Sequence, residues 1–570
     1  MSSTAKKRKS SRIKSNVCVE EDENSRIIIL PSADYSGESD SDVESEEVGV
    51  ADHAAITDFQ DENVLHEYSE LSGDVPGISY RKVLDTYGEN QEKLEPDHEY
   101  EWVDGECVIN DTPDNALLLP TNVQNKIRDS SLVDLFQLFF SLELKEVIVD
   151  ATRENGYDLT IEELDVFVGI LITSMFNGRK SQKDYWSRLP LLRCEPIAAA
   201  MSRNKYSTIK EKIKMSKDSD GNSNDRAWRV RKPLEIFRKN IKCFGYFSTA
   251  LSVDEMMIKF YGRTVLKQYI QNKLDRFGIK MWALCMVNGF LLDCDIYCGK
   301  GTNIYASETN PKLSKCALGS RVVLQMVQNL LLIVTPRKLY QYHLTFDNFF
   351  TGPDLLVHLK NIGLRATGTV RSNRIKTTNE IDKKSKRGTF VSKYDKNSGL
   401  NYITVMYSKP LSVLSTCASV RPFGTVRRYS KEQKKKETLE FPRAFTFYNQ
   451  YMGGVDLHDS HCSNLRSPIR SKKWTWVIFM RLIQSSITNA TVLENLVTHD
   501  KKIGTKDTAQ AVAESYLAKS SYNLERHRYE TAPGKKYCTN SKSCGKRTTK
   551  KCTECNTYQC LSCFTAKHKK

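Results

Sequence analysis

Three mostly apolar segments of this 570-residue chain carry aspartates. LSVDEMMIKF holds Asp254, YHLTFDNFFTG holds Asp347, and YNQYMGGVDLHD holds Asp456 and Asp459. A carboxylate inside a buried strand costs several kcal/mol unless it is paired or binds a metal. Each acid is therefore either a structural group, such as a cap, or part of a chemical site, and no single acid decides between the two.

Carboxylates from distant segments suit one chemistry in particular. Side chains near the carboxyl ends of strands meet at ligand sites in open sheets, and we expect Asp254 and Asp347 at such strand ends. Asp456 and Asp459 are three residues apart and would share one face of a helix. Three convergent carboxylates can hold two divalent cations ~3.5 to 4 Å apart for displacement at a phosphodiester. Oxygen ligands favour Mg²⁺ or Mn²⁺ over zinc.

A second chemical pattern is the cysteine-dense tail. Two Cys-x2-Cys pairs lie close together there, at the usual spacing of tetrahedral zinc ligands, and so short a segment cannot form a core without metal. We expect structural Zn²⁺, since closed thiolate sites are not catalytic. Disulfides and free thiols are the alternatives. The candidate ligands are Cys538, Cys544, Cys552, Cys555, Cys560, Cys563 and His568.

Charge indicates the class of partner. The net charge is +16 with a pI near 9.0, which favours nucleic acid, although a basic protein of another kind would give the same total. The cluster at 6–14, KKRKSSRIK, is typical of a nuclear import signal, although a solvated charge run is about as common. The longest apolar run, Val322 to Val334, is too short to span a membrane. We therefore expect a nuclear protein without a membrane span.

The elements that must position these groups follow from periodicity. Helical spacing runs through about 130–245, with a capping box at Thr160 and Glu163. Two strand-like segments, a helix at about 319–333 and a further strand then predict an α/β domain with a mixed sheet. Residues 371–440 are rich in Lys and Arg and interrupt this pattern as a basic insertion.

Basic residues flank the acids in sequence. Five of them are candidates to contact phosphates, because Lys and Arg near a metal site would neutralise the DNA backbone. For the nearby Trp474 and Trp476 we expect core packing before base stacking. The five candidates for DNA binding are Arg263, Lys267, Arg470, Lys472 and Lys473.

Five motifs together resemble the piggyBac transposase family. SVDEMMIKFYGR, KQYIQNKLDRFGIKMWALC, LTFDNFFTG, YNQYMGGVDLHD and RSPIRSKKWTW occur in the family's order, and the resemblance covers about 130–570. It implies a ribonuclease-H-like catalytic core whose three aspartates fall on Asp254, Asp347 and Asp456, with Asp459 as a further acid. Departures from the family at Leu274, at Phe277 and within KKWTW touch no carboxylate.

The resemblance also implies the zinc pairing, and together with composition and periodicity it gives the expected organisation of the chain. One zinc would be held by Cys538, Cys544, Cys560 and Cys563, and a second by Cys552, Cys555 and His568, with His527 as a fourth ligand. The expected segments are a disordered acidic region (1–125), a helical dimerisation and DNA-binding domain (126–249), the catalytic domain (250–370), the basic insertion (371–442), the end of the catalytic domain (443–466), a second helical DNA-binding part (467–535) and the zinc domain (536–570).

A member of this family would be a homodimer acting on double-stranded DNA. It would cut transposon ends through hairpin intermediates and join them at TTAA targets, and it would take no small-molecule substrate. The alternative is a domesticated descendant that binds DNA or chromatin without transposition. A third class, a zinc-tailed interaction module with an inert α/β body, would not bind magnesium between its strands.

Overall fold

The structure is a computed structural model. It describes residues 98–222, 225–242, 244–270, 275–299, 317–334, 336–430, 434–498, 502–520, 529–539, 544–552 and 556–568. None of the helices in these ranges is long and apolar enough to cross a membrane. The basic cluster at 6–14 and the acidic segments after it lie outside the described residues.

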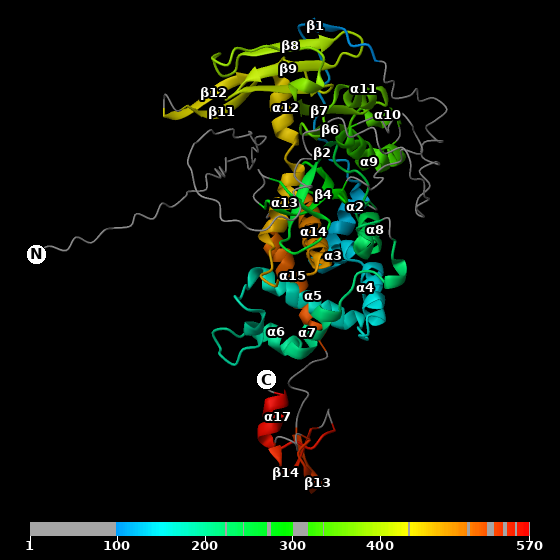
Figure 1. The fold of residues 1–570 in the computed structure, drawn as a ribbon, viewed down its shortest axis with the longest axis vertical. Coiled ribbons are helices and arrows are strands. Elements are labelled where there is room, and N and C mark those ends of the chain that lie inside the picture. Colours follow the sequence, from blue (N-terminus) through cyan, green and yellow to red (C-terminus); the bar gives the residue numbers. More distant parts are fainter. Residues whose placement is uncertain are drawn as a thin grey trace, which may run out of the picture.

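A mixed sheet forms the centre of the molecule (Figure 1). In the described residues its order is β1-β8-β9-β10-β7-β6-β2-β4-β3, with β5 also paired to β4. β6 pairs in parallel with β2 and β7, and the other pairs are antiparallel. The predicted mixed α/β fold is confirmed. The strands are β1 (Trp102–Asp104), β2 (Ala250–Lys259), β3 (Lys267–Tyr269), β4 (Phe277–Met286), β5 (Leu291–Ile296), β6 (His343–Phe346), β7 (Arg365–Val370), β8 (Phe390–Asp395), β9 (Asn401–Met406) and β10 (Pro410–Ser415).

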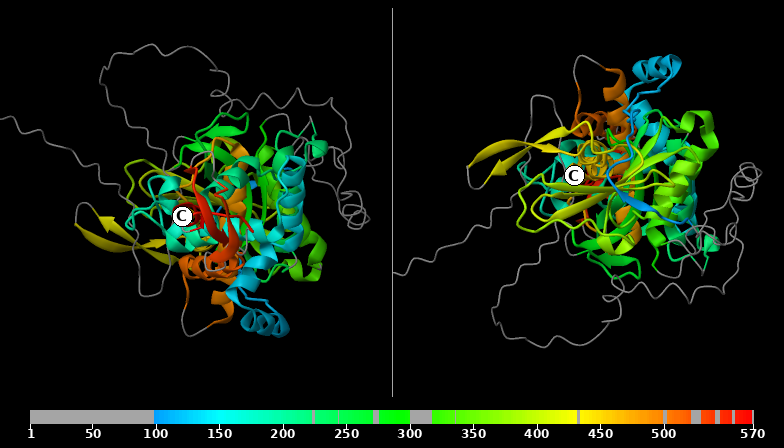
Figure 2. Two further views of the ribbon diagram at one scale, coloured as in Figure 1. Left: turned by 90° about the horizontal axis from the view of Figure 1, so that it is seen from below. Right: turned by 90° about the horizontal axis from the view of Figure 1, so that it is seen from above.

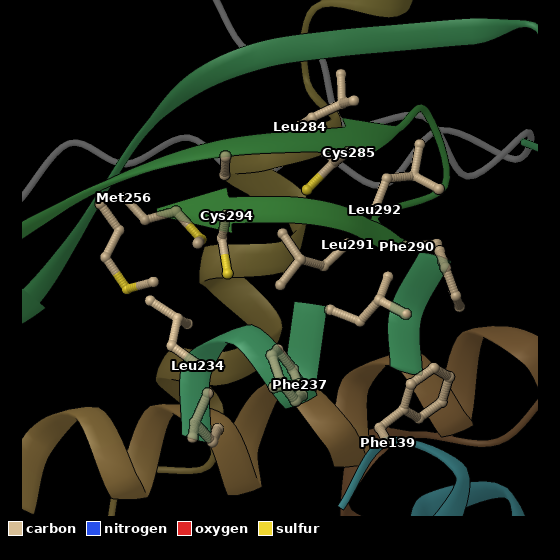
Figure 3. Close-up of a cluster of buried hydrophobic side chains, with 14 of the residues drawn as sticks. Phe139, Leu234, Phe237, Met256, Leu284, Cys285, Phe290, Leu291, Leu292 and Cys294 are labelled. Atoms are coloured by element: carbon tan, nitrogen blue, oxygen red, sulfur yellow. The ribbon is translucent and has the colours of Figure 1, made fainter. Parts of the chain in front are cut away.

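The strands at the centre of the sheet are buried on both faces. Nearly every residue of β2, β4 and β5 is buried, as expected for strands covered by helices on each side. Cys285 and Cys294 lie in this core beside Leu234 and Phe237 of α8 (Trp228–Lys242; Figure 3), where they pack as small apolar residues. The helices beside the sheet are α9 (Leu318–Ile333), α10 (Pro336–Leu339), α11 (Pro353–Asn361), α12 (Arg443–Tyr451) and α13 (Gly454–Asn464).

A helical layer packs below the sheet in Figure 1 and joins segments from both halves of the chain. The predicted helical segment is confirmed, but its capping box is only half formed. Thr160 accepts a hydrogen bond from the Glu163 amide (3.2 Å), while the Glu163 carboxylate pairs with Lys205 (2.5 Å). The helices are α2 (Thr121–Asp129), α3 (Leu132–Phe139), α4 (Leu142–Glu154), α5 (Ile161–Phe176), α6 (Glu195–Ala200), α7 (Arg203–Lys212), α8 (Trp228–Lys242), α14 (Trp474–Val497) and α15 (Thr505–Ala518).

The segment expected as a basic insertion forms strands. β8, β9 and β10 extend the central sheet, because β10 pairs with β7. A separate antiparallel hairpin of β11 (Gly424–Ser430) and β12 (Lys435–Phe441) projects from the body (Figure 2). β12 leads directly into α12, which is followed by α13.

The end of the region predicted to be disordered is ordered. β1 pairs with β8, Trp102 packs edge-on against Tyr402 at 5.8 Å, and Leu119 is buried. The prediction of disorder for 1–125 is therefore wrong for residues 98–125. A few large apolar residues, such as Trp102 and Leu119, pack this stretch against the rest of the protein. The surrounding sequence is predominantly polar, so no strand or helix was predicted there.

Candidate active site

Asp254 and Asp347 lie on neighbouring parallel strands. Val253 of β2 is paired with Phe346 of β6, so the two acids follow at the next position of each strand. Asp347 lies directly after β6, as expected. Asp254 does not lie at a strand end, since β2 continues to Lys259 along β4. Only the parallel pairing ends there, because β6 stops and β2 does not.

Both acids point to the face of the sheet that carries α12 and α13. Ser252 and Thr345 are paired two residues earlier and face these helices. Thr345 Oγ1 donates to the carbonyl of Tyr451 in α12 (3.0 Å), and Ser252 Oγ lies against the start of α13. Side chains two residues apart in a strand share a face, so Asp254 and Asp347 have the same orientation.

α13 brings the third acid to this face. A Cβ built on Gly454 would lie 2.4 Å from the carbonyl oxygen of Met286 and 2.6 Å from Ser252 Oγ. Only glycine therefore allows α13 to start so close to the sheet. Asp456 lies in the first turn of this helix, where the helix dipole stabilises a negative charge.

One buried hydroxyl lies within the electrostatic influence of all three acids. Tyr448 of α12 is buried, and this burial raises the pKa of its phenol well above the usual value. The charges of Asp347, Asp254 and Asp456 raise the same pKa further, while a hydrogen bond with Thr369 lowers it. Three carboxylates from distant segments thus act on a single side chain.

The spacing of the acids is wider than that of a single-ion cage. In the described residues, the only group of three or more candidate ligands whose atoms all lie within 4.8 Å of one another is a set of cysteines. Two cations ~3.5 to 4 Å apart require a wider set of ligands than one cation. The oxygen donors of Asp254, Asp347 and Asp456 fit Mg²⁺ or Mn²⁺.

Local hydrogen bonds fix the orientation of two of these carboxylates. Asp347 Oδ1 accepts from the amide of Phe349 (2.8 Å), and the Asp347 carbonyl accepts from Thr351 Oγ1 (2.7 Å). Asp254 Oδ1 accepts from the amide of Glu255 (2.7 Å). Each aspartate is therefore held by the backbone of its own segment.

Asp459 has a different environment from Asp456. Its carboxylate accepts a hydrogen bond from Arg481 of α14 (2.8 Å), and the Arg481 side chain is buried. His458, between them, bonds to the Gly289 carbonyl (2.9 Å) and to Ser485 Oγ (3.0 Å). The contacts with Arg481 and Ser485 fasten α13 to α14, and the contact with Gly289 fastens it to the turn between β4 and β5. A catalytic role for Asp459 stays a prediction.

The predicted DNA-binding residues occupy two separate places. Arg263 and Lys267 are exposed beside β3. Arg470 and Lys473 lie against α7, where the Arg470 carbonyl accepts from Lys210 (2.8 Å) and Lys473 reaches the Glu211 carbonyl. Lys472 is exposed between them.

A basic groove lies at the second of these places, and its volume is about 600 Å³. The groove is lined by Arg179, Lys180, Ser181, Gln182, Lys210, Pro468, Ile469 and Arg470. The neighbouring Trp476 is 4% exposed and Trp474 packs against the core, which confirms the expected packing of both rings.

The cysteine tail gathers four thiols as the resemblance implied. Cys538, Cys544, Cys560 and Cys563 have sulfur atoms within 4.8 Å of one another, a set that could hold a metal ion. They are brought together by β13 (Tyr529–Tyr537), β14 (Arg547–Cys552) and α17 (Leu561–His568). Of the second predicted set, Cys552 is buried, whereas Cys555, His527 and the side chain of His568 lie outside the described part.

Two contributors to this site were not predicted from the sequence. Tyr448 is the first residue of the motif YNQYMGGVDLHD, for which only the acids were predicted to act, and Arg481 lies in the apolar run VIFMRLI of α14. A single arginine within an apolar run of a helix is a signal that a buried acid lies nearby. For Tyr448 the signal that could have found it is its position at the start of that motif.

The chain matches a known protein family and two human proteins. A family model described as "Transposase IS4" matches residues 131–491. The human "PiggyBac transposable element-derived protein 3" is 29% identical over 469 residues, covering 77% of this chain and 74% of that protein. The human "PiggyBac transposable element-derived protein 2" is 26% identical over 403 residues, covering 69% of this chain and 66% of that protein.

A solved structure has a similar fold. It is described as "Cryo-EM structure of piggyBac transposase synaptic complex with hairpin DNA (SNHP)" and aligns with a TM-score of 0.57 at 21% identity. The alignment covers 77% of this chain and 98% of that chain. The resemblance noted from the five motifs is thereby confirmed.

Proposed function

Because the chain belongs to the Transposase IS4 family, we propose that it is a DNA transposase of the piggyBac type that cuts the ends of a transposon. The observation that supports this most directly is the convergence of Asp254, Asp347 and Asp456 around Tyr448. The solved relative, a synaptic complex with hairpin DNA, supports double-stranded DNA as the substrate.

The chemistry would be in-line displacement at phosphodiester bonds. Bound Mg²⁺ or Mn²⁺ would activate a water or a 3′-hydroxyl and stabilise the leaving oxygen. Asp254 and Asp347, which share one face of the sheet, would hold cations between them, and Asp456 would complete the site from α13. Backbone amides orient the first two carboxylates before substrate binds, so little reorganisation is required.

One such site can serve every step that we propose. Hydrolysis would release a 3′-hydroxyl, this hydroxyl would attack the opposite strand to form a hairpin, and the reopened ends would be joined at TTAA. Each step is the same displacement with a different nucleophile. We further propose that the chain acts as a homodimer in the nucleus, with zinc in the tail.

The proposal is tested by DNA cleavage. The 570-residue protein is incubated with labelled duplex that carries the DNA sequences flanking its gene, with Mg²⁺ or Mn²⁺. We expect Asp254→Asn, Asp347→Asn and Asp456→Asn each to lower nicking at least about a hundred-fold, because even groups that only support a metal ligand contribute 10- to 100-fold. Asp354→Asn, which changes an acid of α11 bonded to Tyr100, is the matched control.

Nicking that persists in all three variants would contradict the assignment of the site. Absence of nicking in the wild type, with duplex binding retained, would favour a second function, a domesticated DNA-binding protein. The names of the two human relatives, which describe them as derived from a transposable element, support this alternative. Inverted repeats ending in TTAA around the gene would support a mobile element instead.

A further inference from the structure

Three aromatic rings lie together on the surface at one edge of the sheet. Tyr261, Tyr269 and Phe277, here named the aromatic patch, are 69%, 43% and 41% exposed. The ring centroids of Tyr269 and Phe277 are 4.8 Å apart, and those of Tyr261 and Phe277 are 6.5 Å apart. Adjoining exposed rings are uncommon on soluble proteins and indicate a binding surface.

The strands fix the positions of these rings. Tyr269 of β3 is paired directly with Phe277 of β4. The next residue, Gly278, lies so close to β2 that a Cβ on it would be 2.4 Å from the Ile258 carbonyl oxygen. This close approach brings the chain just after β2, with Tyr261, beside Phe277. Rings anchored on paired strands form a firm platform.

The surroundings of the aromatic patch are positively charged. Arg263, Lys267 and Arg276 are exposed around the rings. The acid beside them, Asp275, is buried and paired with Lys259 at 2.9 Å. A ligand of the aromatic patch therefore meets flat apolar rings bordered by cations.

The platform shares a face of the sheet with the candidate active site. Asp254 is paired with Ala283 of β4, and Phe277 lies six positions before Ala283. An even separation keeps both side chains on one face, at a distance of about 20 Å along the strand. Tyr269 joins the same face because it is paired with Phe277.

We infer that the aromatic patch binds unpaired bases of the DNA strand by stacking. Single-stranded nucleic acid is bound by aromatic rings that stack on bases and by basic groups that meet phosphates, and both are present here. The inference rests on the proposed function, because it takes DNA as the substrate. A strand cut at the carboxylates would extend across the same face to the rings, where its bases would be held away from their partner strand.

The test measures binding of a single-stranded oligonucleotide that contains 2-aminopurine, by fluorescence quenching and titration, with the full-length protein. We expect Tyr269→Ala and Phe277→Ala each to weaken binding about 5- to 150-fold, the range that stacking contributes per base. Tyr269→Phe keeps the ring and is expected to bind as the wild type does. Tyr340→Ala removes a ring of similar exposure (55%) elsewhere and is the matched control.

Salt dependence separates stacking from charge. Loss of a ring is expected to leave the slope of log affinity against log salt concentration unchanged. Lys267→Ala is expected to reduce the magnitude of that slope by about 1, because one phosphate contact is lost. Weaker binding of fully paired duplex by the same factor as single strands would overturn the inference. An altered molecular mass of the alanine variants in light scattering would also overturn it, in favour of contact with a second copy of the chain.

The outcomes distinguish this inference from the proposed function. If Asp254→Asn abolishes nicking but quenching is independent of the rings, the proposed function stands and the inference fails. If no protein nicks DNA but quenching still requires the rings, stacking stands and the proposed cleavage fails.

Discussion

At the scale of single residues, the candidate site consists of three aspartates and the buried hydroxyl of Tyr448. The three aspartates could be named because they interrupt apolar segments, and the structure brings them to one face of the sheet. Their common neighbour Tyr448 was not predicted, because its aromatic ring resembles any core residue until the fold places it beside charge.

His343 at the start of β6 gives a prediction about pH. Its ring is fully buried between Phe447 and Tyr451, and its nitrogens have no hydrogen-bond partner within the described residues. Burial, with a smaller contribution from the charge of Arg365, lowers the pKa of His343 to about 3. The unfolded chain therefore takes up a proton near pH 6.5 that the folded chain does not.

Stability must then fall as the pH falls from about 7 towards 3. For this single group we expect a loss of about 2 kcal/mol in the free energy of unfolding between pH 7.5 and pH 5. His343→Leu is expected to remove that portion, and urea unfolding at both pH values measures it. An identical pH dependence in the variant would contradict the prediction.

At the scale of elements, the spacing of Asp456 and Asp459 placed both acids on one face of the predicted helix α13. The spacing did not indicate which groups each acid contacts. The structure separates them: Asp456 lies near the sheet, and Asp459 is paired with Arg481 of α14. Such partners depend on how two helices pack, which no local pattern records.

The contact between α13 and α14 gives a prediction about stability. Arg481 is buried and paired with Asp459. Arg481→Met leaves Asp459 without its counter-ion, and we expect the free energy of unfolding to fall by about 3 kcal/mol. Asp459→Asn is expected to cost about as much, because it leaves the buried Arg481 cation without its counter-ion. A double-mutant cycle in urea measures the coupling, and Arg481→Lys is the conservative control. Additive effects of the two substitutions would contradict a direct pairing.

At the scale of the whole molecule, the mixed sheet was predictable because strand and helix patterns alternate along the chain. Its full width was not. The strands of 390–415 join the sheet only through the pairing of β10 with β7, and a basic composition hid their alternation. Likewise β1 adds an edge strand from a polar region. Long-range pairing of this kind depends on register, which composition does not encode.

The tail gives a prediction about metal. Cys560→Ser removes one ligand of the four-cysteine set, so we expect the purified protein to lose one equivalent of zinc, measured by elemental analysis. Limited proteolysis is expected to cut residues 529–568 faster in this variant and after chelation, because a small module without metal lacks a core. Cys417→Ser, a buried thiol outside the tail, is the control. Equal zinc content in both variants would refute the assignment.

The closeness of α13 to the sheet has a consequence for how the chain can vary. No atom larger than hydrogen fits on the α-carbon of Gly454 unless the helix retreats from Met286 and Ser252. Because Asp456 follows two residues later on the same rigid turn, such a retreat would widen the gap between this acid and the two on the strands. The distance between Asp456 and the two strand acids thus depends on Gly454, although Gly454 has no side chain that could take part in the reaction.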